Sequence, residues 1–129
     1  MISTFVDHAR SGDDSTIHGD GEQTRDFVYV EDGVQANILA ITTNDPLTLG
    51  EAYNIGSGTS VSIRKLAELT QDITKADSDT GDTDPRAGDI DHSEPDIEKV
   101  NELLGPEPTV PIKAGLERTV SWYRHEREG

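Results

Sequence analysis

The sequence predicts an α/β protein of mixed short strands and helices in one unit, residues 1–129. Segments with helical spacing of apolar residues alternate with short β-prone runs. The expected order is helix, strand, strand, helix, strand, helix, loop, helix, helix, and these strands are too few to close a sheet. A hydrophobic fraction of 32% is low for a chain of 129 residues. We therefore expect a thin core, or a surface made for a partner.

The first half is expected to hold two helices and two strands. Apolar residues at helical spacing predict a helix over residues 1–10, stopped by Ser11-Gly12. Thr16–His18 is a short strand candidate that ends in a glycine turn. The uninterrupted apolar run Phe27–Val30 predicts a second strand with both faces covered. Acidic residues suit a helix N-terminus and predict a helix over residues 31–42, with one apolar stripe: Val34, Ile38 and Ile41.

The second half is expected to be mostly helical. Residues 51–55 form a strand candidate, and Ser62 can cap the helix that follows. Residues 76–84 are polar, acidic and without periodicity, which predicts an exposed acidic loop. Pro95 suits the first turn of a short helix that ends at Gly105. A last helix is expected to start at Pro111, with an apolar face of Ile112, Leu116, Val120 and Tyr123.

The charge balance restricts the partners. The formal net charge is −15, from 26 acidic and 11 basic residues, and such a surface repels nucleic acid and anionic lipid. Evenly dispersed acids with scarce lysine fit a cytosol of very high salt, although an ordinary acidic protein is the simpler alternative. There is no cysteine, no apolar run long enough for a membrane helix and no visible signal peptide. We expect a cytoplasmic protein.

Two arginines are the strongest candidates for ligand contact. Arg25 follows a Gly-x-Gly turn at the mouth of a strand, and Asp26 beside it could orient the guanidinium. Arg86 stands in a Pro-Arg-Ala-Gly-Asp turn. Two arginines that converge from separate segments suit a diphosphate, because each can donate two parallel hydrogen bonds. The alternatives are a surface ion pair for Arg25 and a solvated turn residue for Arg86.

Other motifs are weaker. Gly56-Ser57-Gly58 precedes a helix, but the third glycine of a dinucleotide fingerprint is replaced by Val61. The acidic run 77–84 fails the calcium-loop template. The four histidines have no zinc spacing, and no nucleophile-elbow motif is present. The sequence therefore predicts no metal site and no catalytic residue.

Several motifs in order resemble one known family over nearly the whole chain. They are the run Gly19–Ala36, Tyr53-Asn54-Ile55-Gly56-Ser57-Gly58, Ser62-Ile63 with Leu66-Ala67, Pro85–Ile90, Gly115-Leu116 and Thr119–Tyr123. The chain resembles the carboxyl-terminal half of NAD-dependent nucleotide-sugar epimerases and dehydratases. These are extended short-chain dehydrogenases/reductases of the UDP-glucose 4-epimerase type.

The resemblance implies a fold and a site. The fold would be the substrate-binding portion of such an enzyme, without its amino-terminal Rossmann half. Arg25 and Arg86 match the arginines that hold the nucleotide diphosphate, and Asp89 matches a residue near the ribose. Thr16 and His18 match the strand whose backbone reads the base, with His18 where an aromatic residue is usual. The ligand would be a UDP- or dTDP-linked sugar.

The resemblance also implies what other parts of such an enzyme supply. Family members carry a Gly-x-x-Gly-x-x-Gly fold for NAD and a Tyr-x-x-x-Lys pair for proton transfer, and neither motif occurs in this sequence. We therefore expect no NAD binding and no turnover by this chain alone. Without an NAD-binding half, the helix from Glu31 and the strand 52–55 would stay uncovered. That predicts self-association, a separate NAD-binding chain as partner, or an isolated chain that is only marginally stable.

Three interpretations stay open. The chain is part of a truncated or split epimerase/dehydratase, a non-enzymatic module that binds nucleotide sugars, or a non-functional remnant. The sequence does not distinguish an epimerase from a dehydratase, nor one sugar from another.

Overall fold

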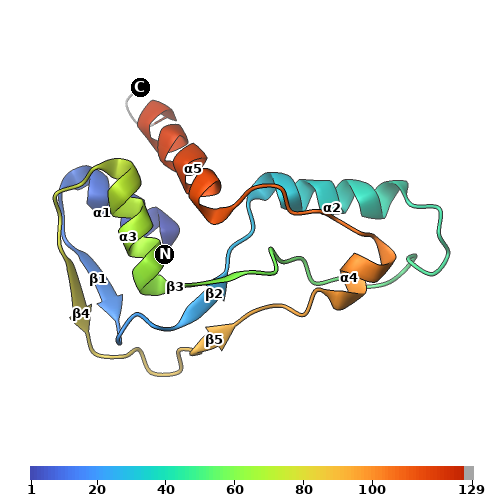
Figure 1. The fold of residues 1–129 in the computed structure, drawn as a ribbon, viewed down its shortest axis with the longest axis horizontal. Helices are drawn as coiled ribbons and strands as arrows, with labels where there is room; N and C mark the ends of the chain where they lie inside the picture. The colour runs from blue at the N-terminus through green and yellow to red at the C-terminus, as the bar shows by residue number, and fades with distance from the viewer. Residues whose placement is uncertain (127–129) are drawn as a thin grey trace.

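The structure is a computed structural model that describes residues 1–126 (Figure 1). Helices and short strands alternate along the chain. They are α1 (Ile2–Ser11), β1 (Ser15–His18), β2 (Thr24–Asp26), α2 (Val30–Thr42), β3 (Ser60–Ser62), α3 (Ile63–Thr74), β4 (Thr80–Thr83), β5 (His92–Ser93), α4 (Glu98–Leu103) and α5 (Ile112–Glu126).

A small hydrophobic core lies where α1, α3 and α5 meet β1. Leu66 of α3 and Leu116 of α5 are almost fully buried, and Ile17 of β1 packs with them. Phe5, Ile63 and Ala67 complete this cluster. The helices form because their apolar residues repeat at helical spacing, and burying that face supplies most of their stability. This cluster lies at one end of the molecule, and only a few apolar residues, such as Ala36 of α2 and Val100 of α4, are buried at the other end.

Two small sheets cross this end. β1 and β4 form a parallel pair in which Ser15 faces Thr80 and His18 faces Thr83. β2 is the middle strand of the other sheet, antiparallel to β3 and parallel to β5. In both sheets, strands far apart in the sequence lie side by side. The loops that follow β1 and β4 are therefore brought to the same edge.

The other end of the molecule is more open. α2 and α4 extend away from the α1–α3 cluster, and α5 stands between the two ends (Figure 1). Asp32 in the first turn of α2 is 5% exposed and accepts hydrogen bonds from Thr109 N, Thr109 Oγ1 and Val110 N. Arg118 of α5 forms an ion pair with Glu31 at 2.6 Å. These polar contacts hold α2 to the segment that leads into α5.

The helix predictions are largely confirmed. α1 ends at Ser11, and Gly12 caps it with φ 73°. Ser62 caps α3 by accepting a hydrogen bond from Lys65 N. α5 begins directly after Pro111. The prediction for Pro95 is wrong, because α4 begins only at Glu98 and the proline lies outside its first turn.

Two strand predictions are wrong. Phe27–Val30 is not a strand: the ladder ends at Asp26, and Val30 already starts α2. Its two valines are exposed rather than covered. Residues 51–55 have no ladder partner among the described residues and are held by side chains, including Tyr53 Oη to Thr48 O at 3.0 Å. Both errors have one cause, since a β-prone segment becomes a strand only beside another backbone.

The acidic segment 76–84 is mostly exposed, but it is not all loop. Thr80–Thr83 is the strand β4, paired with β1. The strand carries no large apolar side chain, so periodicity could not reveal it. It is held instead by backbone pairing and by polar side chains of α3.

The expected apolar stripe of α2 faces outward. Val34 is 50%, Ile38 55% and Ile41 81% exposed. These three residues, with Val30, form what we call the α2 stripe.

Within residues 1–126, no helix combines the length and the apolar character that crossing a bilayer requires.

Candidate functional site

One groove receives all five residues that the sequence singled out. It holds about 370 Å³, and Thr16, His18, Arg25, Arg86 and Asp89 all line it. The floor is apolar and comes mainly from Phe5, Ile17 and Ile63. An adjoining hollow shares His18, Gln23, Arg86 and Asp89 and continues toward Asp20 and His92. We call this continuous depression the arginine groove.

Arg25 is held firmly at the centre of the arginine groove. Its side chain is only 20% exposed. One guanidinium nitrogen donates to the carbonyl of Thr24 at 2.8 Å, and the other donates to Asp89 Oδ1 at 2.7 Å. Asp26 was expected to orient this guanidinium, and that expectation is wrong. Asp26 is the next residue of β2, and successive side chains of a strand point to opposite faces.

Arg86 approaches from the turn after β4. The amide of Asp89 donates to the carbonyl of Arg86 at 3.1 Å, and Gly88 within this turn has φ 81°. The predicted turn is therefore present. Because Asp89 also binds Arg25, the turn is tied directly to the centre of the groove. Thus Asp89 connects the two segments: its carboxylate binds Arg25 of β2, and its backbone amide binds the carbonyl of Arg86 in the turn after β4.

His18 contacts Arg86. The guanidinium nitrogen lies 3.3 Å from His18 Nε2, and His18 Nδ1 lies 3.4 Å from the carbonyl of Asp84. A guanidinium can only donate, so this contact is a hydrogen bond in the tautomer whose Nε2 carries no hydrogen. Arg86 is exposed and keeps donors free for an anion in the groove.

A glycine turn shapes one wall of the groove. Gly19 and Gly21 have φ 78° and 76°, a region that favours glycine. A Cβ on Gly21 would also lie 3.0 Å from Arg64 Cβ and 3.2 Å from Ile17 Cγ2. The turn is compact because no side chain fits there. It brings the strand ends of β1 and β2 to the same wall.

Sequence reasoning missed two polar residues of the groove. Gln23 Nε2 donates to the carbonyl of His18 at 2.6 Å, and His92 Nδ1 lies 3.0 Å from Thr24 Oγ1. Gln23 stands two residues before Arg25, so its place in the glycine-to-arginine run was an available signal. Nothing in the sequence around His92 marks it, because β5 has only two residues.

The Gly56-Ser57-Gly58 turn is already occupied by a carboxylate. Asp26 accepts from Ser57 N at 2.9 Å, Ser57 Oγ at 2.6 Å and Gly58 N at 3.2 Å. A phosphate at this turn would need the same amide groups. The turn therefore binds the chain's own anion, and it does not fit the pyrophosphate of a dinucleotide.

The groups with clearly shifted pKa values lie away from the groove. Burial alone raises the pKa of Asp32, but the hydrogen bonds from Thr109 and Val110 outweigh it, so the pKa is lowered. The hydrogen bond from Lys99 holds the pKa of Glu51 below its usual range. The charge of Glu31 raises the pKa of Arg118. These groups stabilise contacts of α2, α4 and α5.

Metal ligation is not seen in the part of the chain that the structure describes. No three of its histidine, aspartate and glutamate side chains converge as ligands, despite the many acids. The arginine groove presents two guanidinium groups, which can bind an anion. The carboxylates Asp20, Glu22 and Asp91 also line its adjoining hollow.

Comparison with known proteins agrees with this geometry. Residues 1–56 match the family described as NAD dependent epimerase/dehydratase. The chain is 34% identical over 125 residues to a putative UDP-glucose 4-epimerase of Methanocaldococcus jannaschii, covering 97% of this chain and 39% of that protein. It is 32% identical to UDP-glucuronic acid decarboxylase 1 of Xenopus tropicalis, covering 99% of this chain and 30% of that protein.

A solved structure has the same fold over the matched part. The UDP-glucose 4-epimerase of Thermotoga maritima, determined with UDP-glucose, superposes with a TM-score of 0.86 at 38% identity. The match covers 95% of this chain and 38% of that one. The chain thus spans well under half the length of these relatives. Over that length the chain is similar to epimerase/dehydratase proteins, and its α/β fold is that of part of the solved enzyme.

Proposed function

We propose that the arginine groove is the nucleotide-sugar-binding part of an NAD-dependent epimerase/dehydratase of the UDP-glucose 4-epimerase type. Arg25 and Arg86 bind the diphosphate of a UDP- or dTDP-linked sugar. Asp89 lies at the ribose, and the backbone around Thr16 and His18 contacts the base. A diphosphate suits this groove because two guanidinium groups can each donate paired hydrogen bonds to it.

One observation carries the proposal. Five residues chosen from the sequence, on β1, β2 and the turn after β4, line a single groove. A surface ion pair or a solvated turn residue would not require this convergence. The placement of the two arginines also favours anion binding. Asp89 holds Arg25 in place at 2.7 Å, while Arg86 stays exposed and accessible to a ligand. The relatives named above carry UDP-sugar names, which fits a uridine diphosphate ligand.

NAD and the proton-transfer pair come, in this proposal, from an NAD-binding unit outside residues 1–126. The Gly56–Gly58 turn does not fit a dinucleotide, because Asp26 fills its amide groups. When bound to its own unit, NAD supplies hydride transfer. The residues of this chain bind and orient the sugar nucleotide. Epimerase and dehydratase chemistry would both use such a part.

The α2 stripe is the surface on which we place that NAD-binding unit. Val30, Val34, Ile38 and Ile41 are 50–81% exposed on one helix face. The extended segment 51–55, which has no strand partner among the described residues, lies at the same end of the molecule and would form a second part of this interface. Exposed apolar residues on one helix and a free backbone edge are features of an interface. Self-association is the alternative occupant.

Calorimetry with UDP, dTDP and UDP-glucose tests the ligand proposal. We expect binding of a nucleoside diphosphate by the unmodified chain, and a loss of about 10- to 100-fold in Arg25→Ala or Arg86→Ala, because each removes a charge-assisted contact. Arg118→Gln is the matched control, since Arg118 pairs with Glu31 outside the groove. Unchanged affinity in both groove variants would contradict the proposal.

A second experiment separates the enzyme part from a binding module. Turnover of UDP-glucose is measured with the chain alone and with an added NAD-binding domain from a related epimerase. Turnover only in the mixture supports the enzyme part, and nucleotide binding without any turnover in the mixture supports a non-enzymatic module. A remnant would bind no nucleotide. Turnover by the chain alone would contradict the proposal that NAD and the proton-transfer pair come from a separate unit.

A further inference from the structure

The wall of the arginine groove that carries Arg86 has no apolar anchor. β4 reads Thr-Gly-Asp-Thr, and only Thr80 is partly buried while Gly81, Asp82 and Thr83 are exposed. Backbone pairing with β1 holds one edge. Ile17 anchors β1 in the core, but β4 itself brings no apolar side chain to the pair, and a short two-stranded pair gives little stability by itself. Something else must fix the strand that leads into the Arg86 turn.

Two polar side chains of α3 supply that support. Gln71 Nε2 donates to Ser78 O at 2.7 Å and to Thr80 Oγ1 at 2.9 Å. Arg64 NH2 lies 3.0 Å from both carboxylate oxygens of Asp82. Residues 64 and 71 are two helical turns apart and lie on one face of α3. This face therefore contacts β4 at its beginning and near its end.

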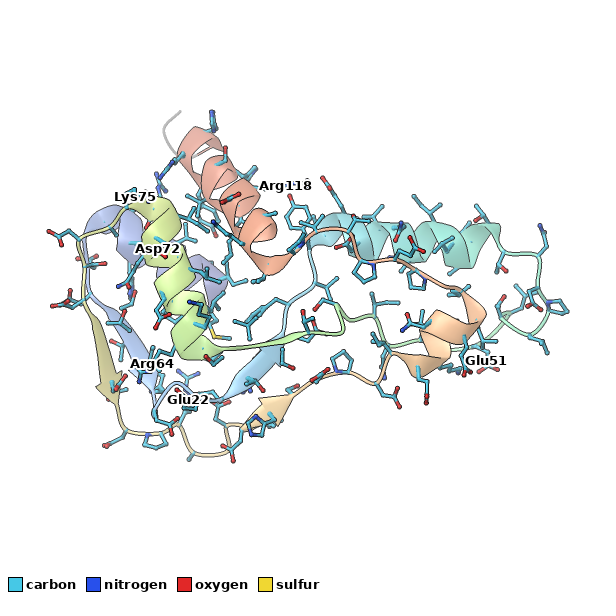
Figure 2. All side chains as sticks on the ribbon, in the orientation of Figure 1. Glu22, Glu51, Arg64, Asp72, Lys75 and Arg118 are labelled. Carbon is cyan, nitrogen blue, oxygen red and sulfur yellow. The ribbon has the colours of Figure 1, made fainter. Side chains whose placement is uncertain are left out.

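Arg64 also holds the glycine turn of the groove. Its Nε donates to the carbonyl of Asp20 at 3.1 Å, and its backbone amide donates to the carbonyl of Gly21 at 3.0 Å. Figure 2 shows Arg64 at the end of α3 nearest the glycine turn, beside Glu22. One guanidinium thus joins the glycine turn to β4, the strand that leads into the Arg86 turn.

We propose that Arg64 is a positioning residue for the nucleotide diphosphate: it fixes the spacing between the Gly19–Gly21 turn and the Arg86 turn. The inference rests on the proposed function of the groove. Arg64 itself need not touch the ligand. A planar guanidinium suits this task because it can donate to a carbonyl and a carboxylate at the same time, which a single ammonium does less well.

Binding of UDP in Arg64 variants is the first test. We expect Arg64→Gln to weaken UDP binding about tenfold. Arg64→Lys should weaken it less, because an ammonium can replace part of the guanidinium's contacts. Lys65→Gln is the control, because Lys65 is the adjacent cation and pairs with Glu68 on the exposed side of α3. A double-mutant cycle then tests whether Arg64 acts through Arg86. If it does, Arg64→Gln should not weaken UDP binding further in a chain that already carries Arg86→Ala.

Amide hydrogen exchange tests the same inference without a ligand. In Arg64→Gln we expect faster exchange at residues 80–90 and unchanged exchange in α1 and α5, whereas Lys65→Gln should match the unmodified chain. Unchanged exchange at residues 80–90 would overturn the inference, as would unchanged UDP affinity in Arg64→Gln. If the unmodified chain bound no nucleotide, the proposed function would fail, and the exchange result alone would decide the role of Arg64.

Discussion

Asp32 is the residue on which the contact between α2 and the connector to α5 depends. Its carboxylate is buried and receives three hydrogen bonds from two consecutive residues. A buried charge is tolerated only when it is well paired, and here its partners are backbone amides, a hydroxyl and the nearby Arg118. Since α2 carries no side-chain cap at its N-terminus, Asp32 also provides the negative charge that the helix dipole favours.

The lowered pKa of Asp32 predicts a loss of stability in acid. Its folded pKa lies below its unfolded value, so the carboxylate stabilises the fold above the usual aspartate range and stops doing so as pH falls through the folded pKa. Asp32→Asn should lower the free energy of unfolding by about 1–3 kcal/mol near pH 7. The difference in the free energy of unfolding between Asp32→Asn and the unmodified chain should become smaller in acid. Urea unfolding between pH 7 and pH 3 measures this.

Two glycines with different surroundings make a matched pair. A Cβ on Gly56 would lie 2.6 Å from Pro95 Cγ and 2.7 Å from Asp26 Oδ2, while a Cβ on Gly33 in α2 meets nothing within 4 Å. Gly56→Ala should cost about 1–3 kcal/mol through overpacking. Gly33→Ala should stabilise the helix by about 0.5–1 kcal/mol. Thermal unfolding of both variants checks this, and equal effects would contradict the packing at Gly56.

The helices could be predicted from the sequence and several strands could not, for a physical reason. A helix satisfies its own backbone, so the capping serine at Ser62 and the stop at Gly12 are visible locally. A strand needs a partner that the local sequence does not reveal. β4 lacks apolar residues altogether, and the apolar run after β2 has no neighbouring backbone to pair with.

The residues that line the arginine groove could be singled out from local motifs, and their role in binding stays a prediction. Arg25 follows a glycine turn and Arg86 stands in a turn with a proline and a glycine, and the family resemblance added Asp89 as a residue near the ribose. The actual contacts were not predictable. Asp89, rather than Asp26, pairs with Arg25, because the pairing depends on how the turn after β4 folds back onto β2.

The α2 stripe should matter for association and hardly for folding. Ile38 and Ile41 are more than half exposed, so replacing each with Asn should change the free energy of unfolding by less than about 0.5 kcal/mol. Leu66→Ala is the contrast: Leu66 is fully buried, and the change should cost about 2–5 kcal/mol. Sedimentation velocity should show less self-association, or weaker binding of an NAD-binding domain, in the two Asn variants. A large loss of stability in them would mean that the stripe is covered within the monomer.

The whole molecule carries far more negative than positive charge. With a net charge of −15, its carboxylates repel one another across the surface, while the exposed ion pairs contribute little. Added salt screens that repulsion. We propose on this basis that the chain is adapted to high salt.

The melting temperature should therefore rise as KCl is raised from 0.05 M to 1 M. Removing charge should reduce the effect, so the Asp77→Asn, Asp84→Asn double variant should depend less on salt than the unmodified chain. A melting temperature that falls with KCl would show that attractive ion pairs dominate and would contradict the charge argument.

The pairing of β1 with β4 also affects the order in which the molecule folds. Each helix forms within a continuous segment, whereas β1 must wait for β4, which comes after α3 and lies farther along the chain than the separation of β2 and β3. Closing so long a loop costs chain entropy before its contacts form, so this step should come late. The two arginines would meet only then. Newly made chains would thus acquire their affinity for a diphosphate at the end of folding, and a nucleotide would capture completed molecules in preference to partly folded ones.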